Sequence, residues 1–355
     1  MISVIGAGPV GSYTAYLLVK AGEKVRIFEE HKEIGKPVHC AGIVSKNLFK
    51  IIKLEDEFIA NKVKGARIYS PNNEFFEVKG KEIEGYILNR EKFDKYLIEK
   101  AVNEGAELFL KHRFISNNKN KIKFENKSYD TDIIIGADGS LSRVAKANNL
   151  GNENFFLGLQ VSIKLKKDNE FVELYMGDFC KKGYGWVVPE NENICRVGIC
   201  TMERNAGEIF NNFLKRFNKN IIDRQSGLIP VYNPKNKICD NNVYLVGDAA
   251  GQVKASTGGG IVIGMSSAGI LADCILNKKD YEREFKKKLG RNMWMNLVIR
   301  NKLNKLDDDK YNELIRIFNK ENIKKYMCEK GDMDFPSRFF LGLLMRQPNL
   351  LKFTL

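Results

Sequence analysis

The stretch that decides the fold is Ile2-Ser-Val-Ile-Gly6-Ala-Gly8-Pro-Val-Gly11, followed by an apolar segment that runs to Glu29. It predicts a strand, a helix and a second strand, over residues 2–5, 9–21 and 24–29. Gly6 permits the tight turn, Gly8 lets the backbone approach a pyrophosphate, and Gly11 lets helix and strand pack closely. The free N–H groups at the helix start attract phosphate. Glu29 is placed to accept hydrogen bonds from ribose hydroxyls, which argues against a 2′-phosphate.

A second glycine-rich element lies far downstream: Val243-Tyr-Leu-Val-Gly247-Asp248-Ala-Ala-Gly251, followed by Thr257-Gly-Gly-Gly-Ile261. The first motif alone fits NAD and FAD equally well. Asp248 ends a buried strand, where it can bind ribityl hydroxyls, and the glycine-rich helix start favours negative charge on a reduced flavin. The pair therefore predicts FAD. The cofactor-binding residues expected from these two elements are Gly6, Gly8, Val10, Gly11, Glu29, Gly247, Asp248, Gly258, Gly259, Gly260 and Ile261.

Composition limits the class of protein. The chain has 355 residues, 43% hydrophobic and 29% charged, which suits one large domain or two closely joined ones. Because Met1 leads directly into an apolar strand, we expect no secretory leader. The apolar run 258–276 contains three glycines, two serines and Asp273, so it reads as a buried core helix rather than a membrane span. We expect a cytoplasmic protein.

Cysteine and histidine usage gives no metal signature. The seven cysteines form no CxxC pair, and the three histidines do not cluster with them. Free thiols in a reducing compartment, and no metal site, are the expectation.

The net charge of +14 has two kinds of explanation, an acidic binding partner or exposed lysines without one. Nucleic acid, an anionic lipid surface or an acidic electron-donor protein would all suit it, and so would solvated helix faces in a lysine-rich chain. No segment resembles a nucleic-acid module, so we expect no nucleic-acid partner. The lysines and arginine that dominate the charge of the last third are Lys278, Lys279, Lys286, Lys287, Lys288 and Arg291.

The order of the remaining elements predicts an α/β fold with a sheet-rich insertion. We expect a hairpin at residues 66–79, a helix at 90–104, a strand at 107–115, a hairpin at 121–129 and a buried strand at 132–136. We then expect antiparallel strands at 155–200, a helical stretch at 204–223, a buried strand at 243–247 and a largely helical end at 281–355. The expected parts are a discontinuous FAD-binding domain (1–65, 85–150 and 238–280), a sheet-rich substrate domain (66–84 and 151–237) and C-terminal helices (281–355).

Five further segments carry a family resemblance. Gly136-Ala-Asp138-Gly139-Ser140 resembles the Asp-Gly motif of the p-hydroxybenzoate hydroxylase branch of the glutathione-reductase-type flavoproteins. The loop from Gly35 to Ser45, the motif Gly183-Tyr184-Gly-Trp186-Val-Val-Pro189 and the segment Gly331–Pro336 resemble the geranylgeranyl reductase family. Asn89-Arg90 matches as well. The chain departs from that family at Val188, where the aromatic motif has Phe, and is shorter than typical members.

The resemblance implies a Rossmann-like FAD fold of the glutathione-reductase type with an inserted antiparallel-sheet substrate domain. It implies hydrogenation of geranylgeranyl double bonds, in archaeal-type digeranylgeranylglycerophospholipids, during membrane lipid biosynthesis. Cys40 is the candidate catalytic residue beside the flavin, unless it is only a small residue in a tight turn. Tyr175, Tyr184 and Trp186 are the expected substrate residues. The implied FAD contacts are Arg90, Asp138, Gly139, Cys40, Ala41, Ile43 and Phe114.

Two other classes share this fold. A flavin-dependent monooxygenase would use NAD(P)H and oxygen, and a prenyl-binding escort protein would not catalyse at all. A halogenase needs Trp-x-Trp-x-Ile-Pro, which does not stand at 184–189. Without a second GxGxxG, the electron donor stays open among a ferredoxin, a deazaflavin and NAD(P)H. The basic helices suggest peripheral contact with an anionic membrane on its inner face.

Overall fold

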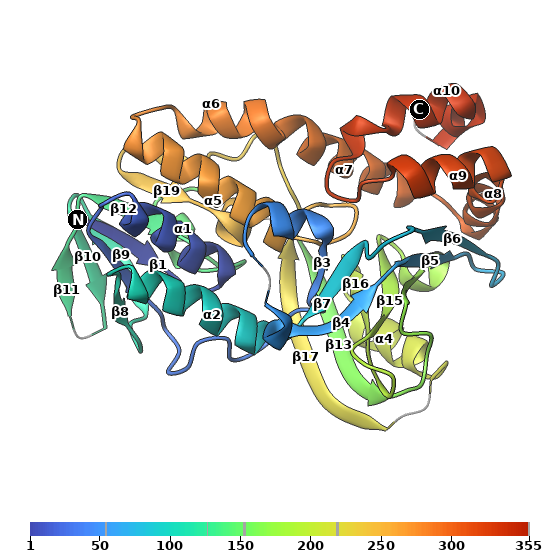
Figure 1. The fold of residues 1–355 in the computed structure, drawn as a ribbon, viewed down its shortest axis with the longest axis horizontal. Coiled ribbons are helices and arrows are strands. Elements are labelled where there is room, and N and C mark those ends of the chain that lie inside the picture. Colours follow the sequence, from blue (N-terminus) through green and yellow to red (C-terminus); the bar gives the residue numbers. More distant parts are fainter. Residues whose placement is uncertain (54, 126, 152–153, 218–219, 354–355) are drawn as a thin grey trace. The chain divides into compact units, whose positions relative to one another are not determined.

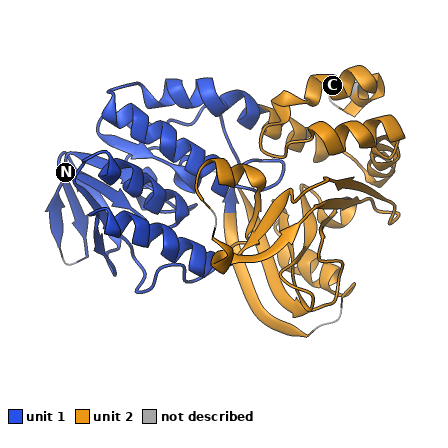
Figure 2. Ribbon diagram, in the orientation of Figure 1, with its two compact units in different colours: residues 1–38, 90–154, 229–294 blue, residues 39–89, 155–228, 295–355 orange. Residues whose placement is uncertain are grey.

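The chain forms two compact units in the computed structural model, which describes residues 1–53, 55–125, 127–151, 154–217 and 220–353. Unit 1 consists of Met1–Val38, Arg90–Asn154 and Ile229–Trp294, and unit 2 of His39–Asn89, Phe155–Leu228 and Met295–Leu355 (Figure 2). Each unit is therefore built from three separate stretches of chain. The three functional parts expected from the sequence remain a prediction.

Unit 1 contains a six-stranded sheet with the predicted βαβ unit at its centre. In spatial order its strands are β18 (Cys239–Asp240), β19 (Val243–Leu245), β12 (Ile133–Gly136), β1 (Ile2–Ile5), β2 (Val25–Phe28) and β8 (Glu107–Phe109). All pairs are parallel except β18–β19. β1 pairs with β2 on one side and with β12 on the other, and all four of its residues are buried. A strand covered on both faces reads as a continuous apolar run, which is why the sequence identified it.

Helices of unit 1 pack on one another beside this sheet. α1 (Pro9–Lys20) contacts both α2 (Arg90–Asn103) and α5 (Ile261–Leu276), as Figure 1 shows. α5 is mostly buried, which confirms the predicted core helix. Among the described residues, no helix combines the length and apolar character needed to cross a bilayer. The shorter helices are α3 (Arg143–Ala147) and α6 (Tyr281–Phe285), and a small sheet joins β9 (Phe114–Asn118), β10 (Lys121–Phe124) and β11 (Ser128–Asp130).

Unit 2 is organised on a seven-stranded sheet. In spatial order its strands are β17 (Ile221–Pro230), β13 (Phe155–Lys164), β16 (Ile194–Thr201), β15 (Gly183–Pro189), β14 (Phe171–Tyr175), β5 (Gly65–Tyr69) and β6 (Phe75–Lys79). The predicted hairpin is confirmed as the antiparallel pair β5–β6. β14 and β5 run parallel, which the expectation of an antiparallel sheet did not include. A second sheet joins β3 (Ile43–Ser45), β7 (Gly85–Leu88) and β4 (Ile59–Val63).

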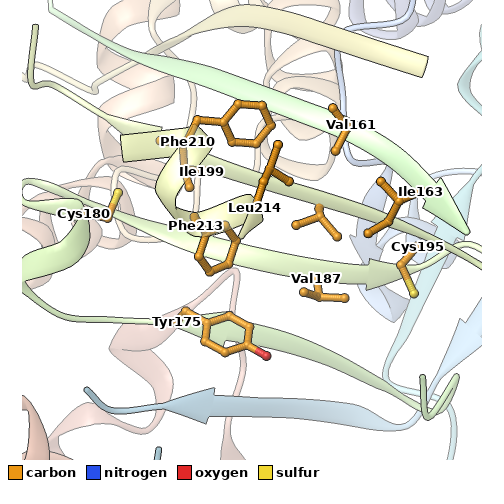
Figure 3. Close-up of a cluster of buried hydrophobic side chains, with 11 residues drawn as sticks. Val161, Ile163, Tyr175, Cys180, Val187, Cys195, Ile199, Phe210, Phe213 and Leu214 are labelled. Carbon is orange, nitrogen blue, oxygen red and sulfur yellow. The ribbon is translucent and has the colours of Figure 1, made fainter. Parts of the chain in front are cut away.

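The core of unit 2 lies between this sheet and α4 (Ala206–Leu214). Phe210, Phe213 and Leu214 of α4 pack on Val187 of β15 and on the inward residues of β13 and β16 (Figure 3). The C-terminal part is helical, as predicted, with α7 (Arg291–Leu303), α8 (Asp308–Phe318), α9 (Glu321–Lys330) and α10 (Phe340–Arg346). A π-helical segment, Lys286–Gly290, links α6 to α7.

Two local predictions are wrong. The helix expected over 204–223 ends at Leu214, and residues 221–230 form β17 instead. Turn hydrogen bonds from Arg216 and Phe217 back to Phe213 and Leu214 close the helix. The single strand expected over 107–115 is two strands in different sheets, because Lys111 takes a left-handed conformation (φ +58°) and turns the chain.

Candidate FAD site and substrate face

Glu29 closes the turn that carries the first glycine motif. Its Oε2 accepts a hydrogen bond from the Ala7 backbone N–H at 2.8 Å. Its Oε1 accepts from the His31 backbone N–H at 3.0 Å and lies 2.6 Å from the His31 ring nitrogen Nδ1. The carboxylate at the end of β2 therefore fixes the loop between β1 and α1. Its expected contact with a ribose stays a prediction.

The three glycines of this motif differ in what a side chain would meet. A Cβ on Gly11 would lie 2.1 Å from the Gly6 carbonyl oxygen, and one on Gly6 would lie 2.4 Å from the Ala137 carbonyl oxygen. Gly6 also has a φ of +102°, so the fold itself requires both glycines. A Cβ on Gly8 would meet nothing within 4 Å, and the Gly8 backbone is extended (φ −68°). No protein group thus explains a glycine at position 8, whereas a phosphate against the backbone would.

Asp248 follows β19 and lies beside the second glycine motif. Its Oδ2 accepts a hydrogen bond from the Ser140 hydroxyl at 3.2 Å. Burial raises the pKa of the Asp248 carboxyl, and Ser140 and the Arg90 charge oppose that rise. A Cβ on Gly260 would lie 3.0 Å from Asp248 Oδ1, so glycine keeps the carboxylate uncovered. Such a carboxylate can take hydrogen bonds from ligand hydroxyls.

The other predicted contacts in unit 1 have protein partners of their own. Asp138 caps α3: its Oδ2 accepts from the N–H groups of Arg143 and Val144 at 2.7 and 3.1 Å. Arg90 makes a bidentate ion pair with Asp94, with N–O distances of 2.9 and 2.8 Å. Val10 packs where Gly247 and Gly264 lack side chains, and Gly139 (φ +77°) has open space at its Cβ position. Phe114 is buried at the start of β9, 6.5 Å from Phe124 between ring centroids.

The loop that carries Cys40 belongs to unit 2, where Arg196 holds it. Arg196 is 6% exposed and pairs with Glu190. Its Nη1 donates to the carbonyl oxygens of Ala41 at 2.9 Å and Leu88 at 3.3 Å. The Cys40 sulfur accepts from the Gly42 N–H at 3.2 Å, and Ile43 begins β3. The sequence analysis missed Arg196; its only signal was a charge within an apolar strand.

The three predicted substrate residues do not share one face of the seven-stranded sheet. Tyr175 is in register with Gly185, and its ring packs on Phe213 of α4, 5.4 Å between centroids (Figure 3). Tyr184 and Trp186 flank Gly185 on β15 and therefore point to the opposite face. Their rings lie 5.9 Å apart. The structure thus brings Tyr184 and Trp186 together and leaves Tyr175 in the core beneath α4.

Glycine and a buried cation shape the face that Tyr184 and Trp186 share. A Cβ on Gly198 would lie 2.4 Å from the Trp186 ring, so the ring crosses β16 there. Its Nε1 donates to Gln160 Oε1 of β13 at 2.9 Å. Arg300, 1% exposed, donates to the Gly183 carbonyl oxygen and lies 5.0 Å from the Tyr184 ring centroid. Burial keeps the pKa of Tyr184 well above its ordinary value, so its hydroxyl stays protonated.

Over residues 1–53, 55–125, 127–151, 154–217 and 220–353, no three His, Cys, Asp or Glu side chains gather in a group that could hold a metal ion.

Comparison with known proteins identifies the class. The model of the FAD binding domain family matches residues 1–277, well over half of the chain. The open backbone at Gly8 and the uncovered Asp248 carboxylate fit that cofactor. The protein is therefore an FAD-dependent oxidoreductase.

The chain belongs to the digeranylgeranylglycerophospholipid reductase family. It is 33% identical to digeranylgeranylglycerophospholipid reductase 3 of Methanosphaera stadtmanae, over 91% of this chain and 92% of that one. The crystal structure of a geranylgeranyl bacteriochlorophyll reductase-like protein from Thermoplasma acidophilum matches with a TM-score of 0.85 and 28% identity, over 99% of this chain and 97% of that one. A probable FAD-dependent monooxygenase from Pseudomonas aeruginosa, at 17% identity and a TM-score of 0.67, over 89% of this chain and 99% of that one, shares the fold alone.

Proposed function

We propose that this protein hydrogenates the carbon–carbon double bonds of the geranylgeranyl chains of digeranylgeranylglycerophospholipids in membrane lipid biosynthesis. The observation that carries the proposal is the 33% identity to a reductase of that name, which extends over 91% of the chain and so covers both units. The expected FAD residues of unit 1 and the buried aromatic pair of unit 2 support it.

FAD, when bound and reduced, would supply a hydride to one carbon of the alkene, and the other carbon takes up a proton. The chain's own residues bind and orient. Gly8 and the start of α1 would take the pyrophosphate, and Asp248 the ribityl hydroxyls. An isolated alkene has no polar group to hold, so an apolar, water-excluding surface must position it. Phe156 of β13 is buried, and its ring centroid lies 5.8 Å from the Arg300 guanidinium carbon, beside Tyr184. We assign Tyr184, Trp186 and Phe156 to the prenyl chain.

Tyr175 lies on the other face of the sheet from Tyr184 and Trp186, so we assign it only an indirect role in substrate binding. It packs beneath α4, and its hydroxyl donates to Glu173 at 2.6 Å. A contribution to the shape of β14 is the role that suits this location.

Cys40 stays the proposed residue next to the flavin, with Ala41 and Ile43 on the same loop. Its thiol accepts one hydrogen bond, from the Gly42 N–H, and serine would keep that acceptor. Cys40→Ser should therefore retain the loop and change turnover and the flavin absorption spectrum. Unchanged turnover together with an unchanged spectrum would remove Cys40 from the mechanism.

Peripheral contact with an anionic membrane is part of the proposal. Lys286, Lys287 and Lys288 are exposed on the π-helical segment, and α10 exposes Leu341 and Met345, each to 68%. Basic and apolar side chains of this kind suit a headgroup surface. Vesicle co-sedimentation that falls with salt and with removal of anionic lipid is the expected result; binding indifferent to both would contradict membrane contact. The donor of electrons stays open among a ferredoxin, a deazaflavin and NAD(P)H.

The test of the reaction is mass spectrometry of the lipid product. Digeranylgeranylglycerophospholipid is incubated without oxygen with the FAD-loaded protein and a chemical reductant of the flavin. A stepwise gain of two hydrogens per double bond is expected. No gain with a stably reduced flavin would refute the proposal, and a lipid retained but unchanged would favour a prenyl-binding protein. Oxygen-dependent product would instead identify a monooxygenase.

A further inference from the structure

The segment Gly331–Pro336, between α9 and α10 in unit 2, carries two aspartates that have no part in the proposed FAD or substrate sites. Asp334 is completely buried, with 0% exposure, and Asp332 is half-buried. A carboxylate loses its hydration when it is buried, so hydrogen bonds within the protein must replace the lost water. The residues that provide these hydrogen bonds therefore indicate what the segment does.

The hydrogen bonds of Asp334 reach far back along the chain, to the end of β3. Its Oδ2 accepts from the Ser45 hydroxyl, 289 residues away, and from Asn47 Nδ2 at 2.9 Å. Ser45 is the last residue of β3, and its Oγ also accepts from the Asn47 N–H at 3.2 Å. Ser45 and Asn47 are both buried. One carboxylate oxygen thus holds the end of β3 and the turn that follows it.

Asp332 gives the segment the shape that places Asp334 there. Its Oδ1 accepts from the backbone N–H groups of Asp334 and Phe335, at 2.9 and 3.2 Å, and so closes a tight turn. The same oxygen accepts from Asn47 Nδ2 at 3.2 Å, and Oδ2 accepts from Arg338 Nη1 at 3.1 Å. Both aspartates therefore contact Asn47, directly after β3.

The C-terminal helices have other attachments to unit 2 besides Asp334. α8 and α9 contact β6, where Asn319 Nδ2 donates to the Phe75 carbonyl oxygen at 3.0 Å. Phe318 of α8 packs on Phe76 of β6, with 5.2 Å between the ring centroids. The helices also share an apolar cluster of their own. Fastening the helices is thus not a sufficient reason for a buried carboxylate at the end of β3.

The loop of Cys40 leads directly into β3, and the backbone after Cys40 is held at two points. Arg196 donates to the Ala41 carbonyl oxygen, and four residues further along Asp334 accepts from Ser45. A buried guanidinium therefore holds one end of this short stretch, and a buried carboxylate holds the other. Fixing both ends of so short a stretch restricts the backbone between them, and with it the direction of the chain at Cys40.

We propose that Asp334 is a positioning residue, which keeps the loop of Cys40 in the conformation that meets the flavin by holding Ser45. The inference rests on the proposed placement of Cys40 next to the flavin. Asp334 itself touches neither cofactor nor substrate, so its effect passes through the backbone of β3. Loss of the carboxylate removes the acceptor that Ser45 and Asn47 share, and the loop gains conformations in which Cys40 lies away from the ring.

The test measures alkylation of the Cys40 thiol in the full chain, with and without saturating FAD, and it needs no lipid. Iodoacetamide is the probe, and mass spectrometry of the Cys40 peptide separates this thiol from the other cysteines. FAD should slow the alkylation of Cys40 in the unmodified protein. Asp334→Leu should lose most of this protection, whereas Asp334→Asn, which keeps an oxygen acceptor for Ser45, should retain it.

Two controls separate the loop from a general loss of stability. Cys328 of α9 is also half-buried in unit 2, and its alkylation should not respond to FAD in any variant. Leu214→Ala removes apolar packing between α4 and the seven-stranded sheet, and should destabilise the protein without changing the protection of Cys40. If Asp334→Leu does not fold, Ser45→Ala removes one of the same hydrogen bonds from the other side and should also lose protection.

Two results would overturn the proposal. Equal protection by FAD in Asp334→Leu and in the unmodified protein would show that the loop does not need the carboxylate. An absence of protection in the unmodified protein would overturn the proposal together with the placement of Cys40. Neither result depends on the lipid, so a failure of the proposed reduction leaves this test intact. With the lipid as substrate, Asp334→Leu should lower kcat about tenfold or more at an unchanged KM.

Discussion

Arg196 of β16 donates a hydrogen bond from Nη1 to the carbonyl oxygen of Ala41, at 2.9 Å, and so joins the large sheet of unit 2 to the loop that carries Cys40. Gly42, next along the loop, has a φ of +76°, and a Cβ there would lie 2.7 Å from the same Nη1. One buried guanidinium thus fixes the backbone on which three expected cofactor residues stand.

Replacing Arg196 by methionine should destabilise the protein by about 2 to 4 kcal/mol. The change leaves Glu190 without its ion-pair partner and removes a donor from two carbonyl groups. Urea unfolding measures the loss. Arg224→Met, on exposed β17, should change stability by less than about 0.5 kcal/mol. Equal losses of stability in the two variants would show that the Arg196 contacts do not stabilise the folded protein.

Gly198→Ala should cost about 1 to 3 kcal/mol, because the new methyl group would lie 2.4 Å from the Trp186 ring. Gly207→Ala is the matched control: it lies in α4 with open space at its Cβ, so alanine there should stabilise by about 0.5 to 1 kcal/mol. The chain has two tryptophans, so Trp186 fluorescence is followed in a Trp294→Phe background. An unshifted emission spectrum in Gly198→Ala would contradict the predicted displacement of the ring.

Gly8→Ala should separate cofactor binding from folding. No protein atom lies within 4 Å of the added methyl group, so the unfolding free energy of the FAD-free protein should stay within about 0.5 kcal/mol. FAD affinity should fall at least about tenfold, because the methyl group would meet the pyrophosphate. Gly11→Ala should instead disturb the FAD-free fold, since its methyl group would meet the Gly6 carbonyl oxygen. Isothermal titration with FAD and urea unfolding give both quantities. Unchanged affinity in Gly8→Ala would place the pyrophosphate elsewhere.

Asp248→Asn tests the raised pKa of Asp248 in the FAD-free protein. Because the folded state raises that pKa above the ordinary value of 3.8, the folded protein holds the proton more tightly than the unfolded chain does. The stabilisation from this group is therefore complete below the ordinary pKa and is lost as pH rises through the raised value. The unfolding free energy of the unmodified protein, relative to Asp248→Asn, should fall as pH rises above the ordinary pKa of 3.8. A pH-independent difference would contradict the shift.

The sequence predicted the parts of the fold that have a local pattern. β1 and α5 were identified because a strand or helix that is mostly buried is also mostly apolar. The motif glycines were identified because their spacing reflects backbone geometry. The boundaries of α4 and the break at Lys111 were missed, since turn hydrogen bonds and a left-handed lysine leave no such pattern.

The sequence alone did not predict which substrate residues share a face of the sheet, because strand register determines this. Alternation along β15 places Tyr184 and Trp186 on one face, but the face of Tyr175 depends on its pairing with Gly185 across the sheet. Arg196 was missed for a related reason. Its importance comes from a segment that folds back on it, since Ala41 lies 155 residues away along the chain.

The chain starts in unit 1 and returns to it twice, which sets an order of events during synthesis on the ribosome. The phosphate turn at Gly8 is made first, its neighbouring strand β12 follows after the whole of β3 to β7, and α5 comes only after β13 to β17 have been translated. For most of its translation, the nascent chain therefore contains the first glycine motif but not the second. A site that needs both glycine motifs can be completed only after residue 261 has been translated, because a shorter chain lacks α5, the helix that follows the second motif.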